Sequence, residues 1–219
     1  KKAREIIAEY DVDVILTTSP PHSQHIIGLH LKRKAGLPWV ADFRDPWTSD
    51  LRFMQYKKGW RGLIDRWMEK RILKNADVVV ATTKSATESF RQKAPASCDK
   101  SKFKCIINGY DSNDYEQHGR ASNTEYMNFA YVGSTGPYIS NPSFFFHALT
   151  KALEREPGMR EKIRVQFVGG LDQENRLLIQ TLGLEDVVSF LGFFPHRKAI
   201  KLISDSDVLL LFELPVGTN

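Results

Sequence analysis

The sequence lacks the features that mark several large classes of protein. No apolar run among its 219 residues approaches the roughly 20 residues that span a bilayer, so no transmembrane helix is predicted. Only two cysteines occur, Cys98 and Cys105, and they form no metal-ligand pattern. We therefore predict free thiols in a reducing, cytoplasmic compartment, with no metal and no cofactor.

Motifs for nucleotide and nucleic-acid binding are also missing. Neither GxGxxG nor GxxxxGK[ST] occurs. The net charge of +5 is uneven, because residues 1–120 hold 22 Lys and Arg against 15 Asp and Glu, whereas residues 121–219 hold nine against 11. With no nucleic-acid motif beside it, a basic first half favours an anionic membrane or a phosphorylated substrate over nucleic acid.

The chain opens with KKAREIIAEY, a charged helical pattern rather than a secretory signal. From there, strand-like runs of apolar residues alternate with patterns of helical spacing. The predicted strands cover 11–19, 39–43, 77–83, 103–108, 127–133, 163–170, 187–192 and 207–214. The predicted helices cover about 22–34, 60–75, 85 onward, 141–154, 172–182 and 196–204.

This alternation predicts an α/β fold with parallel sheets, because each helix returns the chain for another strand in the same direction. A polar segment without periodicity, 112–126, is typical of a linker. We therefore predict two Rossmann-like domains, 1–111 and 127–219, each with about four strands and each incomplete. The strands are almost wholly apolar, which indicates helices on both faces of each sheet. Ligands are expected outside the carboxyl ends of the strands.

The segment DFRDPWT, at the end of the second predicted strand, is the densest polar cluster. Asp42, Arg44 and Asp45 stand together there, with Trp47 close behind. Such a cluster can orient a hydroxyl group or bind a phosphate. It can also be a structural Arg–Asp pair that holds its own loop. Its place at a strand end favours the functional interpretation.

Other strand ends carry weaker signals. The first strand runs into TTSPPHS, where His22 is either a functional residue or part of a helix cap with Ser19 and Ser23. In the second half, VGSTGPY and VGG place glycines between a strand and a helix. Glycines there let a phosphate approach the backbone at a helix N-terminus, although a plain tight turn has the same composition.

Residues 52–74 combine eight Lys and Arg with only two Asp and Glu. Aromatic residues are interleaved with these charges: Phe53, Tyr56, Trp60 and Trp67. One interpretation is a peripheral surface that contacts anionic lipid or a lipid-linked acceptor at the inner face of a membrane. The other, which we favour for Leu63, Ile64 and Trp67, is that these side chains pack on the protein's own sheet. For Phe53 and Tyr56, both interpretations remain open.

The order of these strand ends carries a resemblance. DVILTTSPPHS, GLPWVADFRDPWT, ADVVVATT and INGYD are followed by YVGSTGPYISNPSFFFHAL, VQFVGG, LGLEDVVSFLGFFPHRKAI and SDSDVLLLFELP. The series resembles retaining GT-B glycosyltransferases of the family-4 (group 1) type, with acceptor-side motifs first and donor-side motifs second. The resemblance implies retaining transfer of a sugar, usually without a metal. The donor is a nucleotide-diphosphate sugar, and the acceptor is a hydroxyl group on a polysaccharide, glycan or lipid-linked molecule.

The resemblance also implies site residues. On the donor side these are Gly133, Ser134, Ser140, Gly169, Gly170, Phe193 and Phe194. Gly133 and Ser134 would face the donor phosphates. Phe193 and Phe194 would contact the nucleotide base, and Gly169 and Gly170 would form the glycine turn that precedes them. On the other side, Arg44 falls where many relatives place a reaction-centre histidine. Asp42 and Asp45 complete the implied catalytic group, and His22 and Trp47 the acceptor side.

The sequence departs from the family in three places. Ser134 and Ser140 stand where relatives commonly carry cations that neutralise the diphosphate. The family's first strand would lie before Lys1, and its two glutamates, separated by seven residues, would lie after Asn219, so we expect the 219 residues alone to be inactive. Two alternatives stay open: a non-catalytic protein that binds sugar nucleotides or glycans, and a nucleotide-sugar epimerase with the same architecture.

Overall fold

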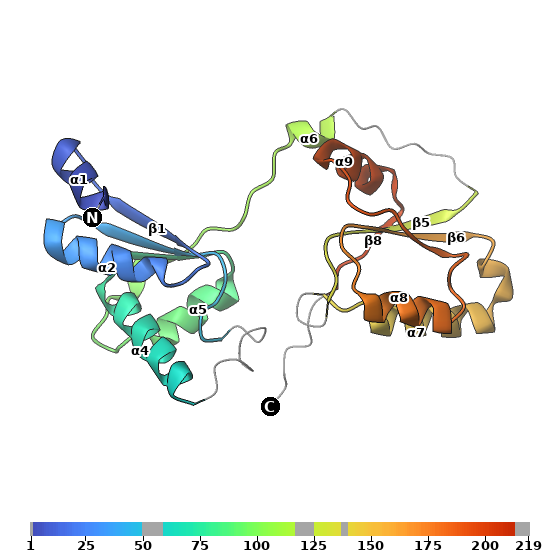
Figure 1. Cartoon of the computed structure of the whole chain (residues 1–219), viewed down its shortest axis with the longest axis horizontal. Helices are drawn as coiled ribbons and strands as arrows, with labels where there is room; N and C mark the ends of the chain where they lie inside the picture. The colour runs from blue at the N-terminus through green and yellow to red at the C-terminus, as the bar shows by residue number, and fades with distance from the viewer. Residues whose placement is uncertain (1, 50–58, 117–124, 137–139, 213–219) are drawn as a thin grey trace. The chain divides into compact units, whose positions relative to one another are not determined.

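A computed structural model describes residues 2–49, 59–116, 125–136 and 140–212. The chain divides into two compact units, Lys1–Gly109 and Tyr110–Asn219 (Figure 1). Each unit is built on one four-stranded sheet in which every described pairing is parallel. The predicted fold class, two Rossmann-like parallel sheets with four strands each, is confirmed.

The first unit has the strand order β1-β2-β3-β4. Thr17 pairs with Ala41, Ala41 with Val79, and Val79 with Phe103, so the four strands end at the same edge. Figure 1 shows α2, α4 and α5 on the same side of this sheet. The elements are α1 (Lys2–Glu9), β1 (Ile15–Ser19), α2 (Gln24–Ala35), β2 (Trp39–Phe43), α4 (Trp60–Asn75), β3 (Val78–Ala81), α5 (Lys84–Lys93), η1 (Lys100–Lys102) and β4 (Phe103–Cys105).

The core of the first unit lies between the sheet and these helices. Trp39, Phe43 and Phe90 are fully buried in it. The prediction that helices cover both faces of the sheet fails here. Leu16, in the middle of β1, is 66% exposed, because side chains alternate between the faces of a strand and Leu16 points away from the core.

The second unit has the strand order β7-β6-β5-β8. β6 and β8 flank β5 on opposite sides, so the order reverses between β5 and β8, a position where open α/β sheets bind ligands. Figure 1 shows α9 on the face of the sheet opposite to α7 and α8. The elements are α6 (Asn113–Glu116), β5 (Met127–Val132), α7 (Ser143–Arg155), η2 (Pro157–Met159), β6 (Ile163–Val168), α8 (Gln173–Thr181), β7 (Val188–Phe190), α9 (His196–Asp205) and β8 (Val208–Leu209).

Part of the predicted linker is structured. Its residues 113–116 form the short helix α6, which packs on α9. The Asp114 Oδ2 and His196 Nε2 atoms are 2.9 Å apart. This segment is therefore held to the second unit by a polar contact that the linker's composition does not indicate.

The packing predicted for α4 is wrong. Ile72 and Leu73 are buried, but Leu63 is 62% and Trp67 is 59% exposed, and Ile64 is exposed as well. The helix turns Gly62 and Glu69 toward the protein instead. Phe53, Tyr56 and the rest of 52–58 lie outside the described residues. None of the described helices is long and apolar enough to cross a membrane.

Candidate functional site

The ends of β1 and β2 bring the first predicted cluster together. Thr18 pairs with Asp42 in the sheet, and its Oγ1 donates a hydrogen bond of 2.7 Å to Asp42 Oδ2. Directly after β2, the Arg44 backbone N–H donates to the carbonyl of Ser19, the last residue of β1, at 3.1 Å. Arg44 has an exposed side chain, and its own carbonyl accepts a hydrogen bond from Thr82. Three strand ends therefore converge on Asp42, Arg44 and Asp45.

His22 and Trp47 form an aromatic platform beside this cluster. Their rings stack with centroids 5.2 Å apart and planes 15° from parallel. The His22 Nδ1 atom is 3.0 Å from the hydroxyl of Ser19, a fully buried residue. Ser23, at the start of α2, makes no capping hydrogen bond with its side chain. The ring of His22 therefore packs on the buried side chains of Phe43 and Trp47, and Ser23 provides no cap for α2.

A buried carboxylate holds the loop that carries Trp47. Glu69 accepts hydrogen bonds from the backbone N–H of Thr48 at 3.1 Å and from its hydroxyl at 2.6 Å. The Lys93 ammonium lies 3.1 Å from the same carboxylate, whose side chain is only 3% exposed. Sequence analysis missed this anchor. The available signal was a lone acidic residue on the same helical face as Ile72 and Leu73.

His25 lies directly beneath the platform. Trp39 Nε1 donates to Thr17 Oγ1 at 2.8 Å, and His25 Nδ1 lies 2.8 Å from the same hydroxyl. The Nε2 atom of His25 is buried and has no hydrogen-bond partner among the described residues. Burial, and then the nearby His22, lowers the pKa of His25 to about 4. His25 is therefore neutral at physiological pH.

This histidine makes the first unit sensitive to acid. Because the pKa of His25 is lower in the folded state than its usual 6.5, protons bind the unfolded state more strongly. Stability is fully present above about pH 6.5 and falls by up to about 3 kcal/mol as the pH approaches 4. Tryptophan fluorescence during urea unfolding reports this, since all four tryptophans lie in the first unit. His25→Gln should flatten the pH dependence, while the exposed His30→Gln should not; equal slopes in all three proteins would contradict the assignment.

In the second unit, hydrogen bonds link the turns after β5, β6 and β7. Gly133 N–H donates to the Val168 carbonyl, Thr135 N–H to Gly170, and Gly169 N–H to Gly192, at 2.8–2.9 Å. Gly169 has φ of +121°, and a Cβ atom there would lie 2.1 Å from the Gly133 carbonyl oxygen. Glycine is therefore required where the two turns touch.

The predicted donor-side residues meet at this junction. A Cβ atom on Gly170 would lie 3.4 Å from Ser134 Oγ and 3.6 Å from the ring of Phe193. Phe193 is 80% exposed, so its ring is free to stack on a flat ligand. Gly133, Ser134, Gly169, Gly170 and Phe193 thus form one surface, with backbone on its floor.

Ser140 has a different environment. It is 5% exposed, and its hydroxyl donates to the Phe212 carbonyl at 3.1 Å. Its backbone forms an antiparallel bridge with Gly136. A hydroxyl whose proton is already donated offers only an acceptor, which does not suit an anionic phosphate. The geometry therefore gives Ser140 a role in closing the turn after β5.

Asp172 links the turn after β5 to the beginning of α8. Its carboxylate caps α8, accepting from the Asn175 backbone at 3.0 Å and from Thr135 Oγ1 at 2.8 Å. Burial opposes ionisation here, but the hydrogen bonds from Asn175 and Thr135 hold the pKa of Asp172 below its ordinary value. The turn after β5 is thus tied to the first turn of α8.

Two cations that sequence analysis missed lie near the beginnings of the helices that follow β6 and β7. Arg176, in the first turns of α8, directs its Nε toward the Leu171 carbonyl at 3.5 Å and lies over the Phe190 ring. Lys198, in the first turn of α9, has its ammonium 3.8 Å from the centre of the half-buried Phe194 ring. No motif marks either residue, because each comes from a helix that follows a different strand. The described His, Cys, Asp and Glu side chains form no group of three that could hold a metal.

Comparisons with solved structures agree with this fold. Sucrose-phosphate synthase from Thermosynechococcus elongatus matches with a TM-score of 0.66 at 17% identity, over 94% of this chain and 52% of its own. An E. coli trehalose-6-phosphate protein bound with UDP-2-fluoro glucose matches with 0.65 at 14%, over 94% and 54%. A putative UDP-N-acetylglucosamine 2-epimerase from Listeria monocytogenes matches with 0.53 at 14%, over 95% and 54%.

The chain therefore spans about half the length of the solved structures it matches, and the likeness at these identities concerns the fold. No curated protein sequence matches. Residues 2–99 match the family of the glycosyl transferase 4-like domain, and this match covers most of the first unit. The first unit therefore matches the glycosyl transferase 4-like domain, and the two parallel sheets share the fold of the solved structures named above.

Proposed function

We propose that this chain supplies the acceptor-side and donor-side parts of a retaining glycosyltransferase. A sugar moves from a nucleotide-diphosphate donor to a hydroxyl group of a polysaccharide, glycan or lipid-linked acceptor. The observation that carries the proposal is the contact between the turns at Gly133 and Gly169. It removes side chains from the floor of the surface beside Ser134 and Phe193, where a diphosphate and a base would lie.

The charge of this surface supports a diphosphate. Arg176 and Lys198 supply the positive charge that Ser134 and Ser140 do not, each from the beginning of a helix. Cationic side chains and helix N-termini both stabilise phosphate oxygens. As the acceptor oxygen replaces the diphosphate on the sugar carbon, these cations would stabilise the negative charge of the leaving group.

The first unit would orient the acceptor. At the end of β2, the Asp42 carboxylate can accept hydrogen bonds and the Arg44 guanidinium can donate them. The stacked rings of His22 and Trp47 follow the ends of β1 and β2. Trp47 is only 3% exposed, so it would hold the ring of the half-buried His22 in place, and His22 alone would contact the acceptor. The rate of glycosyl transfer by a longer protein that contains this chain, measured with Arg44→Ala and with Asp45→Ala, tests this role. Unchanged rates in both variants would remove the cluster from the reaction.

Binding of UDP to the 219-residue chain, measured by calorimetry, tests the donor surface directly. Arg176→Gln should weaken binding by about tenfold to a hundredfold, the value of a charge-assisted hydrogen bond. Gly170→Ala should fold normally but place a methyl group between Ser134 and Phe193, and so weaken binding too. Arg155→Gln, an exposed cation on α7, is the matched control.

Three outcomes separate the candidate functions. Equal UDP binding by Arg176→Gln, Gly170→Ala and the control would refute the donor surface. Tight binding with no turnover of any sugar nucleotide by a longer protein that contains this chain would favour the non-catalytic binder. Conversion of the sugar nucleotide in the absence of acceptor would favour the epimerase. Transfer that requires an acceptor hydroxyl supports the proposal.

A further inference from the structure

The exposed face of α4 is an apolar stripe of regular helical spacing. We call the α4 face the set of four residues Trp60, Leu63, Ile64 and Trp67, which are 67%, 62%, 44% and 59% exposed. Positions i, i+3, i+4 and i+7 lie on one side of a helix. Two tryptophans and two aliphatic residues side by side in water are unfavourable, and such patches mark interaction surfaces.

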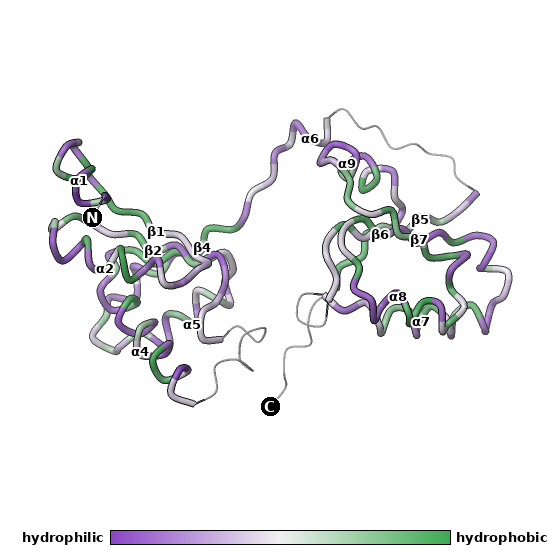
Figure 2. The backbone as a smooth tube through the Cα atoms, viewed as in Figure 1, coloured by the Kyte–Doolittle hydropathy of each residue, from purple (hydrophilic) through white to green (hydrophobic). Residues whose placement is uncertain are grey.

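Positive charge surrounds this stripe. Helix α4 carries Arg61, Arg66, Lys70, Arg71 and Lys74 against only Asp65 and Glu69. Glu69 is buried against Lys93, so its charge does not act at the surface. The guanidinium groups of Arg61 and Arg71 lie 5.5 Å and 4.9 Å from the ring centres of Trp60 and Trp67. Figure 2 shows hydrophobic and hydrophilic residues alternating along α4.

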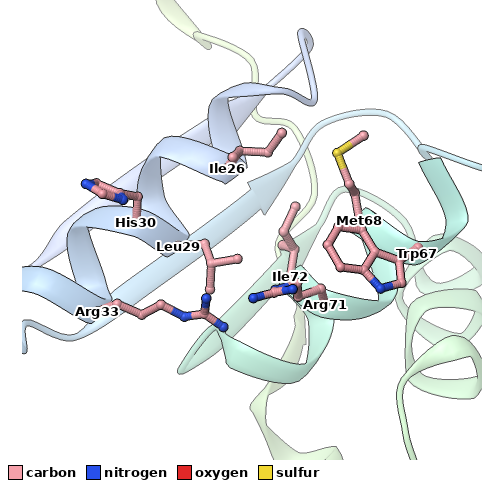
Figure 3. Close-up of a pocket in the computed structure, with 8 residues that line it drawn as sticks. All are labelled: Ile26, Leu29, His30, Arg33, Trp67, Met68, Arg71 and Ile72. Atoms are coloured by element: carbon pink, nitrogen blue, oxygen red, sulfur yellow. The ribbon is translucent and has the colours of Figure 1, made fainter. Parts of the chain in front are cut away.

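A groove between α2 and α4 continues the surface (Figure 3). Its cavity of about 290 Å³ has apolar walls formed by Ile26 and Leu29 from α2 and by Met68 and Ile72 from α4. The adjoining cavity of about 400 Å³ is lined by Lys70 and Lys74. Arg33 and Arg71 line both cavities, one from each helix. An apolar slot with two guanidinium groups matches an apolar chain that ends in a phosphate.

We propose that this surface binds an anionic phospholipid membrane. The α4 face enters the boundary between headgroups and acyl chains, and Arg33 and Arg71 bind lipid phosphates at the groove. The opposite side of α4 packs on the protein, and an exposed surface with Trp and Leu among Lys and Arg suits the headgroup region of an anionic membrane. A second copy of the chain is disfavoured, because facing surfaces would bring like charges together.

This inference goes beyond glycosyl transfer and involves none of the donor-side residues. It has a consequence for the acceptor, because a protein seated on a bilayer meets lipid-linked hydroxyl groups at the surface where it binds. The membrane is also a partner for residues 59–74, the described part of the basic aromatic stretch 52–74.

Tryptophan fluorescence provides a direct test. Among the four tryptophans, Trp39 and Trp47 are buried, while Trp60 and Trp67 are exposed. The 219-residue chain is mixed with vesicles of phosphatidylcholine, alone or with phosphatidylglycerol, in which part of the phosphatidylcholine is brominated. We expect quenching with phosphatidylglycerol present and little without it, and less quenching as salt is raised. Quenching requires that Trp60 or Trp67 reach the acyl chains.

Vesicle sedimentation with matched variants assigns the binding to this surface. Arg66→Gln with Lys70→Gln should reduce binding about fivefold for each charge removed. Trp60→Ser with Leu63→Ser should remove most of it. The controls are the same kinds of change on α7, where Phe144 is 82% exposed: Phe144→Ser, and Lys151→Gln with Arg155→Gln. All substituted side chains are exposed, so each variant should retain the unfolding midpoint of the parent chain.

Several results would overturn the proposal. These are no binding to anionic vesicles at low salt, equal binding to neutral vesicles, and equal losses in the α4 and α7 variants. A dimer that Trp60→Ser with Leu63→Ser converts to a monomer would instead assign the face to a second copy. Arg176→Gln keeps the two proposals separate, because it should lose UDP binding and keep vesicle binding.

Discussion

Replacing Gly169 with alanine is expected to destabilise the second unit strongly. The added Cβ atom would lie 2.1 Å from the Gly133 carbonyl oxygen, and φ at this position is +121°. The close approach requires the backbone of one turn to move. The positive φ puts alanine into a backbone conformation that L-residues rarely adopt. Together they cost about 3 to 5 kcal/mol, a large part of the 5 to 15 kcal/mol that stabilises a typical domain.

Hydrogen exchange followed by mass spectrometry measures the loss of stability in each unit separately. Peptides from β5, β6 and α8 should lose protection in Gly169→Ala, while peptides from β1 to β4 provide an internal reference. Gly158→Ala is the matched control, because nothing lies within 4 Å of its Cβ position. Gly170→Ala should also keep its protection, which separates loss of UDP binding from loss of fold. Full protection in Gly169→Ala would show that the two turns do not touch.

Removing the Glu69 carboxylate should destabilise the first unit almost as much. Glu69→Ala leaves the Lys93 ammonium without a carboxylate partner and the Thr48 backbone N–H without its acceptor. Breaking a buried ion pair costs about 3 to 5 kcal/mol, and the partial exposure of Lys93 places this case near the lower limit. Because Thr48 follows Trp47 directly, the platform with His22 should loosen as well.

Urea unfolding followed by tryptophan fluorescence measures this loss. Glu88→Ala is the control, since Glu88 also pairs with a cation of α5 but both side chains are exposed. An exposed pair of this kind contributes at most about 1 kcal/mol. Glu69→Ala should therefore lower the midpoint far more than Glu88→Ala. Equal midpoints would mean that Glu69 does not anchor the loop.

The sequence predicted the fold class because strand and helix periodicities are local properties. The largely apolar runs at 39–43 and 163–170 predict parallel strands without any other information. The strands β2 and β6 lie within these runs. The glycine turns after β5 and β6 were found for the same reason. Sequence analysis did not find Arg176 or Lys198, because helical spacing alone does not show which side chains of a first turn contact the neighbouring aromatic rings.

The error at α4 has a physical cause. Spacing shows that Leu63, Ile64 and Trp67 share one side of a helix, but it does not show which way that side faces. The contacts of Gly62, Glu69 and Ile72 with the protein fixed the rotation of the helix. Glu69 could turn inward because Lys93 and Thr48, distant in sequence, satisfy its carboxylate.

The sequence by itself determined the alternation of strands and helices, the two-part division and the strand ends that carry polar and glycine turns. These follow from patterns within some 20 residues. Only the tertiary structure decided that Gly169 touches Gly133, that His22 stacks on Trp47, and that the α4 face points outward. Each of these depends on distances between segments far apart in the chain, which packing fixes and local composition does not.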